Sequence, residues 1–209
     1  EHKIISSSKL LSRQENPSMK ILFVNCCMKP DKESRTYRLA TAFLDKYQEL
    51  NNKDVHIFEV ALKNEAIRPI SNKDLAYRLK LIQDRVFRYA TKFANADRIV
   101  IAAPYWDLSF PSILKIYFEN VFVTNLTFYY EGTEVKSLCK AEKLLYVTTS
   151  GGYVEGMDFG TDYVRGVAKM FEIGSFDALK AEGLDIDESA AEAILSESIA
   201  VAEDLATKW

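Results

Sequence analysis

Several features that mark specialised classes of protein are scarce or absent in this sequence of 209 residues. The three cysteines, Cys26, Cys27 and Cys139, form neither a disulfide framework nor a metal-binding spacing, so we expect a reducing, cytoplasmic location. A net charge of −3 provides no basic face for nucleic acid. No apolar stretch reaches the roughly 18 residues that a spanning helix needs. We therefore expect no nucleic-acid partner and no membrane insertion.

The composition suits one soluble globular domain. Hydrophobic residues make up 48% of the chain and charged residues 27%, which is ordinary for such a domain. We expect this single domain to span residues 19–209. Residues 1–18, EHKIISSSKLLSRQENPS, are polar and rich in Ser, and they lack the apolar core of a secretory signal. We expect them to be either a non-native leader or an arm that docks on a partner subunit.

From Met19 onward, strand-like segments alternate with helix-like segments. Short apolar runs predict strands at 20–25, 54–60, 98–103, 143–149 and about 175–180. Amphipathic spacing predicts helices at 34–50, 72–96, 109–122 (capped by Ser109), about 158–172 and 188–207, with a short excursion or hairpin at 126–138. Such alternation implies parallel strands joined by right-handed crossovers. We therefore predict an α/β fold: a doubly wound, five-stranded parallel sheet of the flavodoxin-like order 2-1-3-4-5, with helices on both faces.

The loops after the first, third and fourth predicted strands are informative, because sheets of this kind bind ligands beyond the carboxyl ends of their strands. After the first strand a helix opens with Ser34, Arg35 and Thr36. Hydroxyls, free N–H donors and the positive end of the helix dipole make an anion site there, although Ser34 alone would be an ordinary N-cap. The loop has neither G-x-G-x-x-G nor a P-loop pattern, which disfavours a dinucleotide on a glycine fingerprint and a nucleoside triphosphate.

The other two loops carry aromatic and glycine residues. PYWDL (104–108) follows the third strand, and a Pro-aromatic turn offers both polar backbone groups and an apolar face to a flat ring such as an isoalloxazine. Taken alone, it is equally well an aromatic plug over the sheet edge. TTSGGYVEG (148–156) follows the fourth strand, with hydroxyls at Thr149 and Ser150 and glycines that permit close backbone approach. All three loops lie on one rim of the predicted sheet, and this coincidence predicts a binding site.

Four stretches give the chain a resemblance to a known family: SRT (34–36), PYWDLSFPSILKIYFENV (104–121), LTFYYEGTEVKSL (126–138) and TTSGGYVEG. From about Met19 the chain resembles the FMN-dependent NAD(P)H:quinone and azo-dye oxidoreductases, the azoreductase family with the flavodoxin-like fold. The resemblance implies two-electron, ping-pong hydride transfer from NADH or NADPH through FMN to a quinone, an azo compound or a related aromatic. It also implies a homodimer with a shared pocket. No catalytic side chain is implied, because the flavin carries the chemistry.

The resemblance assigns roles residue by residue. The FMN phosphate would be held by Ser34, Arg35 and Thr36. The flavin ring would contact Pro104, Tyr105, Trp106, Asp107 and Leu108. The pyrimidine edge of the ring would meet Thr149, Ser150, Gly151, Gly152 and Tyr153. A lid over the substrate would be formed by Phe128 and Tyr130, for which core packing is the alternative role.

Two departures from the family pattern stand out. Asp107 occupies a position where the family usually has Asn, so an amide donor is lost, and a carboxylate near the ring would disfavour the anionic reduced flavin. Cys26 and Cys27 lie near positions where many members have Ser, and a thiol is only a weak donor to a phosphate. Two other functions on the same fold stay open at this point: a one-electron carrier of the flavodoxin kind, and a flavin-free regulatory or interaction protein.

Overall fold

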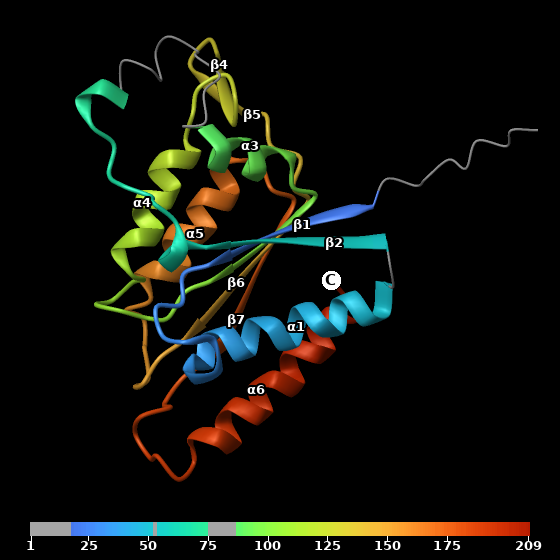
Figure 1. Ribbon diagram of the computed structural model, residues 1–209, viewed down its shortest axis with the longest axis vertical. Coiled ribbons are helices and arrows are strands. Elements are labelled where there is room, and N and C mark those ends of the chain that lie inside the picture. The colour runs from blue at the N-terminus through green and yellow to red at the C-terminus, as the bar shows by residue number, and fades with distance from the viewer. Residues whose placement is uncertain (1–17, 52–53, 75–86) are drawn as a thin grey trace, which may run out of the picture.

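A five-stranded parallel sheet with helices on both faces forms the framework of the computed structural model, which describes residues 18–51, 54–74 and 87–209 (Figure 1). Residues 1–17 of the expected leader or arm lie outside the described residues. So does the middle of the helix predicted at 72–96, residues 75–86. No helix among the described residues is long and apolar enough to cross a bilayer.

The sheet has the strand order β2-β1-β3-β6-β7, and every neighbouring pair is parallel. The predicted fold and strand order are therefore confirmed. The inner strands are buried on both faces, which explains their continuous apolar runs: four of the five residues of β3 are buried. The strands are β1 (Met19–Asn25), β2 (Val55–Ala61), β3 (Arg98–Ala102), β6 (Lys143–Thr149) and β7 (Ser175–Ala181).

Helices cover the two faces of the sheet in two separate layers, each over its own hydrophobic core (Figure 1). One layer holds α1 (Arg35–Asn51) and α6 (Ala191–Ala206). The other holds α3 (Arg88–Asn95), α4 (Ser112–Val121) and α5 (Phe159–Met170). Two short 3-10 turns, η1 (Asp31–Glu33) and η3 (Leu62–Asn64), follow β1 and β2. Each helix thus buries its apolar side against the sheet.

An antiparallel hairpin of β4 (Phe128–Glu131) and β5 (Glu134–Ser137) interrupts the alternation of parallel strands and helices. It lies within 126–138, where a short excursion or hairpin is expected from the sequence. Gly132 turns the hairpin with φ of +63°, a conformation that glycine adopts without steric cost. In Figure 1 the hairpin lies at the top, beyond α3 and α4 and away from the carboxyl ends of the sheet strands.

The predicted start of the helix at Ser109 is wrong. The helix α4 begins at Ser112 with Pro111 at its N-cap. Ser109 instead closes a tight turn, in which its N–H donates to the carbonyl of Trp106 (2.8 Å) and its carbonyl accepts from the N–H of Trp106 (3.1 Å). The turn places Ser109 two residues before the N-cap position, which Pro111 occupies.

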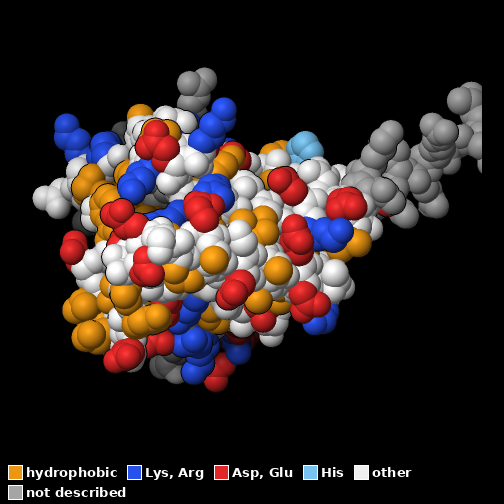
Figure 2. All heavy atoms as spheres, turned by 90° about the horizontal axis from the view of Figure 1, so that it is seen from below, with side chains coloured by type: hydrophobic (Ala, Val, Ile, Leu, Met, Phe, Trp, Pro, Cys, Tyr) orange, Lys and Arg blue, Asp and Glu red, His pale blue; other side chains and the backbone are white. Residues whose placement is uncertain are grey.

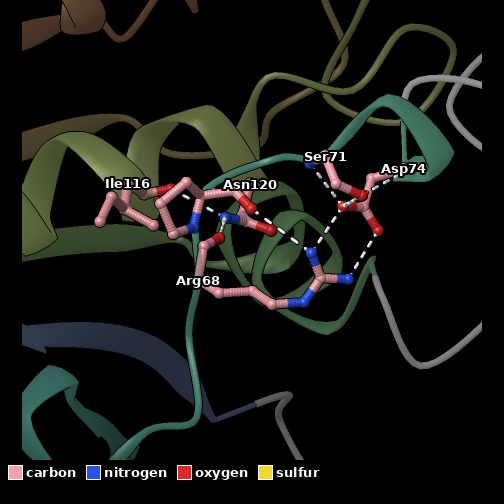
Figure 3. Close-up of polar contacts among 6 residues, drawn as sticks. Arg68, Ser71, Asp74, Ile116 and Asn120 are labelled. Carbon is pink, nitrogen blue, oxygen red and sulfur yellow. Dashed lines mark hydrogen bonds and ion pairs between the residues drawn. The ribbon is translucent and has the colours of Figure 1, made fainter.

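The segment that follows η3 is fastened to α4 by a polar network (Figure 3). Both Nη atoms of Arg68 donate to the carboxylate of Asp74 (2.8 and 2.9 Å), and the N–H and hydroxyl of Ser71 donate to the same carboxylate (2.7 and 2.6 Å). These donors hold the pKa of Asp74 well below its usual range. The Asn120 amide donates to the carbonyls of Ile116 (2.9 Å) and Arg68 (3.4 Å), which joins the segment to the helix.

The N-terminus of α5 is fixed by Asp158. Its carboxylate accepts from the N–H of Thr161 (2.9 Å), from the Thr161 hydroxyl and from the ammonium of Lys180 on β7. Burial alone would raise the pKa of Asp158, but the bonds from Lys180 and Thr161 outweigh it and hold the pKa below its usual value. The loop between β6 and α5 is thereby anchored to β7.

We expect Asp158→Ala to lower the free energy of unfolding by about 1–2 kcal/mol, because α5 loses its N-cap. The pKa of Asp158 is lower in the folded protein than in the unfolded chain, so its contribution is fully present above about pH 4. It is lost as the pH falls through the folded-state pKa. Urea denaturation of the wild type and the variant, near neutral pH and again in acid, measures both effects.

Asp162→Ala is the matched control. Asp162 lies in the first turn of the same helix, but its side chain is 67% exposed and pairs with Arg165 on that helix. It should cost less than half as much as Asp158→Ala. Equal losses for the two variants, or a difference that persists in acid, would contradict the capping role.

Candidate functional site

One pocket lies at the carboxyl edge of the sheet, where the loops after β1, β3, β6 and β7 meet. Most residues predicted for a site line it: Ser34, Arg35, Thr36, Pro104, Tyr105, Trp106, Thr149, Ser150 and Gly151. Four further residues that line the pocket were not predicted from the sequence: Met28, Lys29, Glu33 and Asp185. The rule that ligands bind beyond strand carboxyl ends applies equally to the loop after the fifth strand, and it would have drawn attention to Asp185.

The N-terminus of α1 forms one wall of the pocket. The hydroxyl of Ser34 accepts from the N–H of Tyr37 (3.2 Å), so Ser34 is the N-cap of this helix. The N–H groups of Arg35 and Thr36 belong to the first turn, where an α-helix leaves its donors without intrahelical acceptors. The positive end of the helix dipole lies at the same place. This wall can therefore hold an anion.

A buried pair of hydroxyls fixes that wall to the middle of the sheet. The Oγ1 atoms of Thr36 on α1 and Thr149 at the end of β6 lie 2.6 Å apart and share a hydrogen bond. Both side chains are buried. The neighbouring Thr148 differs, because its buried hydroxyl has no hydrogen-bond partner among the described residues. The pair sets the distance between the helix N-terminus and the loop after β6.

Arg35 is already engaged within the chain. Its Nη1 donates to the carbonyl of Leu184 (2.8 Å), and its Nη2 donates to the carboxylate of Asp185 (2.7 Å). The expectation that this guanidinium faces a phosphate thus meets a competing anion. The side chain of Arg35 is 26% exposed and that of Asp185 is 64% exposed, so the ion pair lies at the surface of the pocket.

The loop between β3 and α4 forms the aromatic wall. The N–H of Tyr105 donates to the carbonyl of Thr149 (3.0 Å), and its hydroxyl donates to the carbonyl of Met157 (3.0 Å). Trp106 lines the pocket and is 48% exposed. Asp107 and Leu108 form the tip of the tight turn with φ of +47° and +68°, and neither lines the pocket. The loop therefore brings three of its five predicted residues to the pocket.

Only some of the residues predicted in the loop after β6 line the pocket. Gly151 lines the pocket, whereas Gly152 and Tyr153 do not. The carbonyl of Gly152 accepts from the hydroxyl of Ser150 (2.6 Å) and from the N–H of Gly183 (3.2 Å). The ring of Tyr153 packs on Gly183, since a Cβ atom there would lie 3.1 Å from the ring. The loop is thus held by the segment after β7.

Phe128 and Tyr130, expected as a lid, are not among the pocket residues of this chain. Phe128 is buried in the core, which is the alternative role considered for it. Tyr130 is exposed on the hairpin and packs edge-on against the ring of Phe128, with ring centroids 5.7 Å apart. Within a single chain the structure does not bring these two residues to the pocket.

The two cysteines of the first loop are structural rather than reactive. Cys26 and Cys27 are fully buried and neither lines the pocket. Burial raises the pKa of Cys26 to about 12 and that of Cys27 to about 11, so both are thiols near neutral pH. The part of the chain that the structure describes holds no group of three or more His, Cys, Asp or Glu side chains placed to bind a metal ion.

Known proteins resemble this chain in sequence or in structure. A family model described as the flavodoxin-like fold matches residues 19–205. The FMN-dependent NADH:quinone oxidoreductase 2 of Clostridium acetobutylicum is 32% identical over 199 residues, which cover 91% of this chain and 99% of that protein. The FMN-dependent NADH:quinone oxidoreductase of Coprothermobacter proteolyticus is 32% identical over 200 residues with the same coverage. A solved azoreductase from Bacillus anthracis superposes with a TM-score of 0.82 at 22% identity, over 91% of this chain and all of that one.

We expect Thr149→Val to lower the free energy of unfolding by about 1–3 kcal/mol, because it leaves the buried Thr36 hydroxyl without a partner. Thr148→Val is the matched control: it removes a hydroxyl that already lacks a partner, so stability should stay unchanged or rise. Urea denaturation measures both variants and the double variant Thr36→Val/Thr149→Val, which should cost less than the sum of its single changes. Equal losses at positions 148 and 149 would contradict the role of the pair.

Proposed function

The chain belongs to the family of FMN-dependent NADH:quinone oxidoreductases with a flavodoxin-like fold, and from this premise we propose that it binds FMN in the pocket at the carboxyl edge of its sheet. With FMN bound, the protein transfers two electrons from NADH to a quinone, an azo compound or a related aromatic acceptor. The observation that carries the proposal is the convergence of a helix N-terminus, an aromatic turn and a Ser-Gly loop on one pocket.

The residues of the pocket suit the two ends of FMN. The hydroxyl of Ser34 and the N–H groups of Arg35 and Thr36 would hold the phosphate, where the helix dipole favours negative charge. Pro104, Tyr105 and Trp106 would form the apolar wall beside the ring. At the polar edge of the ring would lie Thr149, Ser150 and Gly151.

The chain keeps these walls in fixed positions. The bond from the Tyr105 N–H to the Thr149 carbonyl joins the aromatic wall to the polar edge, and the Thr36–Thr149 pair joins that edge to the phosphate wall. Such prior organisation limits the conformational entropy lost when a ligand binds. We assign no general acid or base, because the side chains of this pocket bind and orient while the bound flavin supplies the redox chemistry.

For the predicted residues at the edge of the pocket we propose a supporting role. Asp107, Leu108, Gly152 and Tyr153 adjoin the pocket without lining it, so we expect them to support its walls rather than to touch the ring directly. Asp107 has a left-handed backbone, which Asn and Asp adopt more readily than most residues. An Asp in place of the Asn usual in the family is therefore compatible with the same turn.

We also propose a homodimer that packs around the mouth of the pocket. Large apolar side chains there are exposed, and we call them the apolar rim: Trp106, Leu108, Tyr153, Met157 and Phe159. Its two loops are joined by a bond from the N–H of Phe159 to the carbonyl of Leu108 (3.1 Å). Figure 2 shows hydrophobic side chains gathered at the left end of the molecule, the end that holds the loops after β3 and β6 in Figure 1. Exposed apolar patches of this kind mark interaction surfaces. A second copy would also be needed to bring Tyr130 to a pocket.

The test of the function is spectroscopic. We expect the purified protein, after addition of FMN and removal of free flavin, to absorb between about 350 and 500 nm as a flavoprotein. NADH added without air should bleach this absorbance, and a quinone should restore it. Bound flavin that NADH cannot bleach would favour the one-electron carrier instead. No retained flavin would contradict the proposal and favour the regulatory alternative.

Tryptophan fluorescence reports where the flavin binds. The sequence has two tryptophans: Trp106 lines the pocket, and Trp209 is buried against Phe43 on α1. FMN should quench the emission of Trp209→Phe, in which Trp106 remains, more strongly than that of Trp106→Phe. The reverse order would place the flavin away from the aromatic wall.

The dimer is tested with Phe159→Glu, which puts a charge into the apolar rim. Light scattering after size exclusion should give twice the 23.8 kDa chain mass for the wild type and the single mass for the variant. Val201→Glu is the control, since Val201 is equally exposed on α6 but lies outside the rim. A monomeric wild type, or a dimer disrupted by Val201→Glu and not by Phe159→Glu, would contradict this interface.

A further inference from the structure

Asp185 places a carboxylate in the pocket where the proposed function requires a phosphate. It lines the pocket together with Ser34, Arg35 and Thr36. Its side chain is largely exposed and stands on the loop after β7, 150 residues from the arginine with which it pairs. Like charges at short range repel, so a bound phosphate and this carboxylate cannot share Arg35 without cost.

The two halves of the Arg35 guanidinium have partners of different kinds. Nη1 donates to a main-chain carbonyl, that of Leu184, whose side chain is buried and whose N–H donates to the carbonyl of Ser150 (3.2 Å). This acceptor is fixed by the fold. Nη2 donates to the Asp185 carboxylate, which is carried on a side chain that is 64% exposed. The arginine is therefore oriented by one partner that cannot leave and paired with one that can.

The absence of a side chain at Gly151 leaves the space that the Asp185 carboxylate occupies. The N–H of Asp185 donates to the carbonyl of Gly151 (2.9 Å), so the two backbones run side by side. A Cβ atom on Gly151 would lie 2.2 Å from the second carboxylate oxygen of Asp185, which means that the carboxylate lies directly over this glycine. Any other residue at position 151 would therefore require the carboxylate to shift.

We propose that Asp185 is an internal competitor for the phosphate of FMN. On binding, the phosphate replaces the Asp185 carboxylate at Nη2 of Arg35, while Nη1 stays on the Leu184 carbonyl and keeps the guanidinium in position. The exchange satisfies Arg35 in the absence of flavin and lowers the affinity for a phosphorylated flavin specifically. This inference rests on the proposed function, because it requires FMN in this pocket.

The experiment compares FMN with riboflavin, which has the same ring and no phosphate. In Asp185→Asn we expect the dissociation constant of FMN to fall by about threefold to fivefold, as for loss of one partly exposed charge interaction, and that of riboflavin to stay unchanged. Quenching of flavin fluorescence measures both constants. Asp187→Asn is the matched control: Asp187 lies on the same loop but accepts from Ser189 and does not line the pocket. It should change neither constant.

A second variant separates exchange at Arg35 from general repulsion. If Asp185 acts by occupying Arg35, the gain from Asp185→Asn should disappear in the background of Arg35→Met. A gain that persists there, an equal gain for riboflavin, or an unchanged or weaker FMN affinity in Asp185→Asn would overturn the inference. These outcomes leave the proposed function intact as long as the wild type binds FMN and is bleached by NADH. A wild type that binds neither flavin overturns both.

Discussion

All neighbouring strands of the sheet run in the same direction, and the site depends on this constraint. Parallel strands must be joined by crossovers, so α1, which follows β1, starts at the edge where that strand ends. The N-terminus of α1, with its unpaired donors and positive dipole, is consequently delivered to the edge that also receives the loops after β3, β6 and β7. The parallel arrangement alone brings the helix N-terminus and these loops together. The Thr36–Thr149 hydrogen bond sets the distance between α1 and the end of β6.

The charged side chains that line the pocket balance one another. Lys29 and Arg35 line it, but so do Glu33 and Asp185, which leaves two cations facing two carboxylates. The proposed attraction for a phosphate would therefore come from oriented dipoles and directed donors rather than from excess positive charge. The buried thiols of the first loop add no charge, because desolvation keeps them protonated. With two charges of each sign in the lining, the loss of one carboxylate would leave it with a net positive charge.

The fold was predictable because its signals are local. Buried parallel strands such as β3 and β6 read as short apolar runs, and the amphipathic segments between them gave the helices. Five strands alternating with helices suit the flavodoxin-like order. Most pocket residues followed from the same reasoning applied to three loops. Two features were not predictable. The turn that displaces Ser109 places Leu108 in a left-handed conformation, against the preference of its residue type. The pairing of Arg35 with Asp185 joins residues 150 positions apart, and no local pattern marks it.

The tight turn at 106–109 has a consequence for how this site can vary. With φ of +47° at position 107, few residue types are tolerated there: Asn, Asp and Gly enter that region most easily, and β-branched residues are excluded. Substitution at position 107 is therefore largely confined to three residue types: Asn with a neutral amide, Asp with a carboxylate, and Gly with no side chain. The backbone conformation of this turn therefore limits which charge the residue at position 107 can place beside the pocket: a negative charge or none.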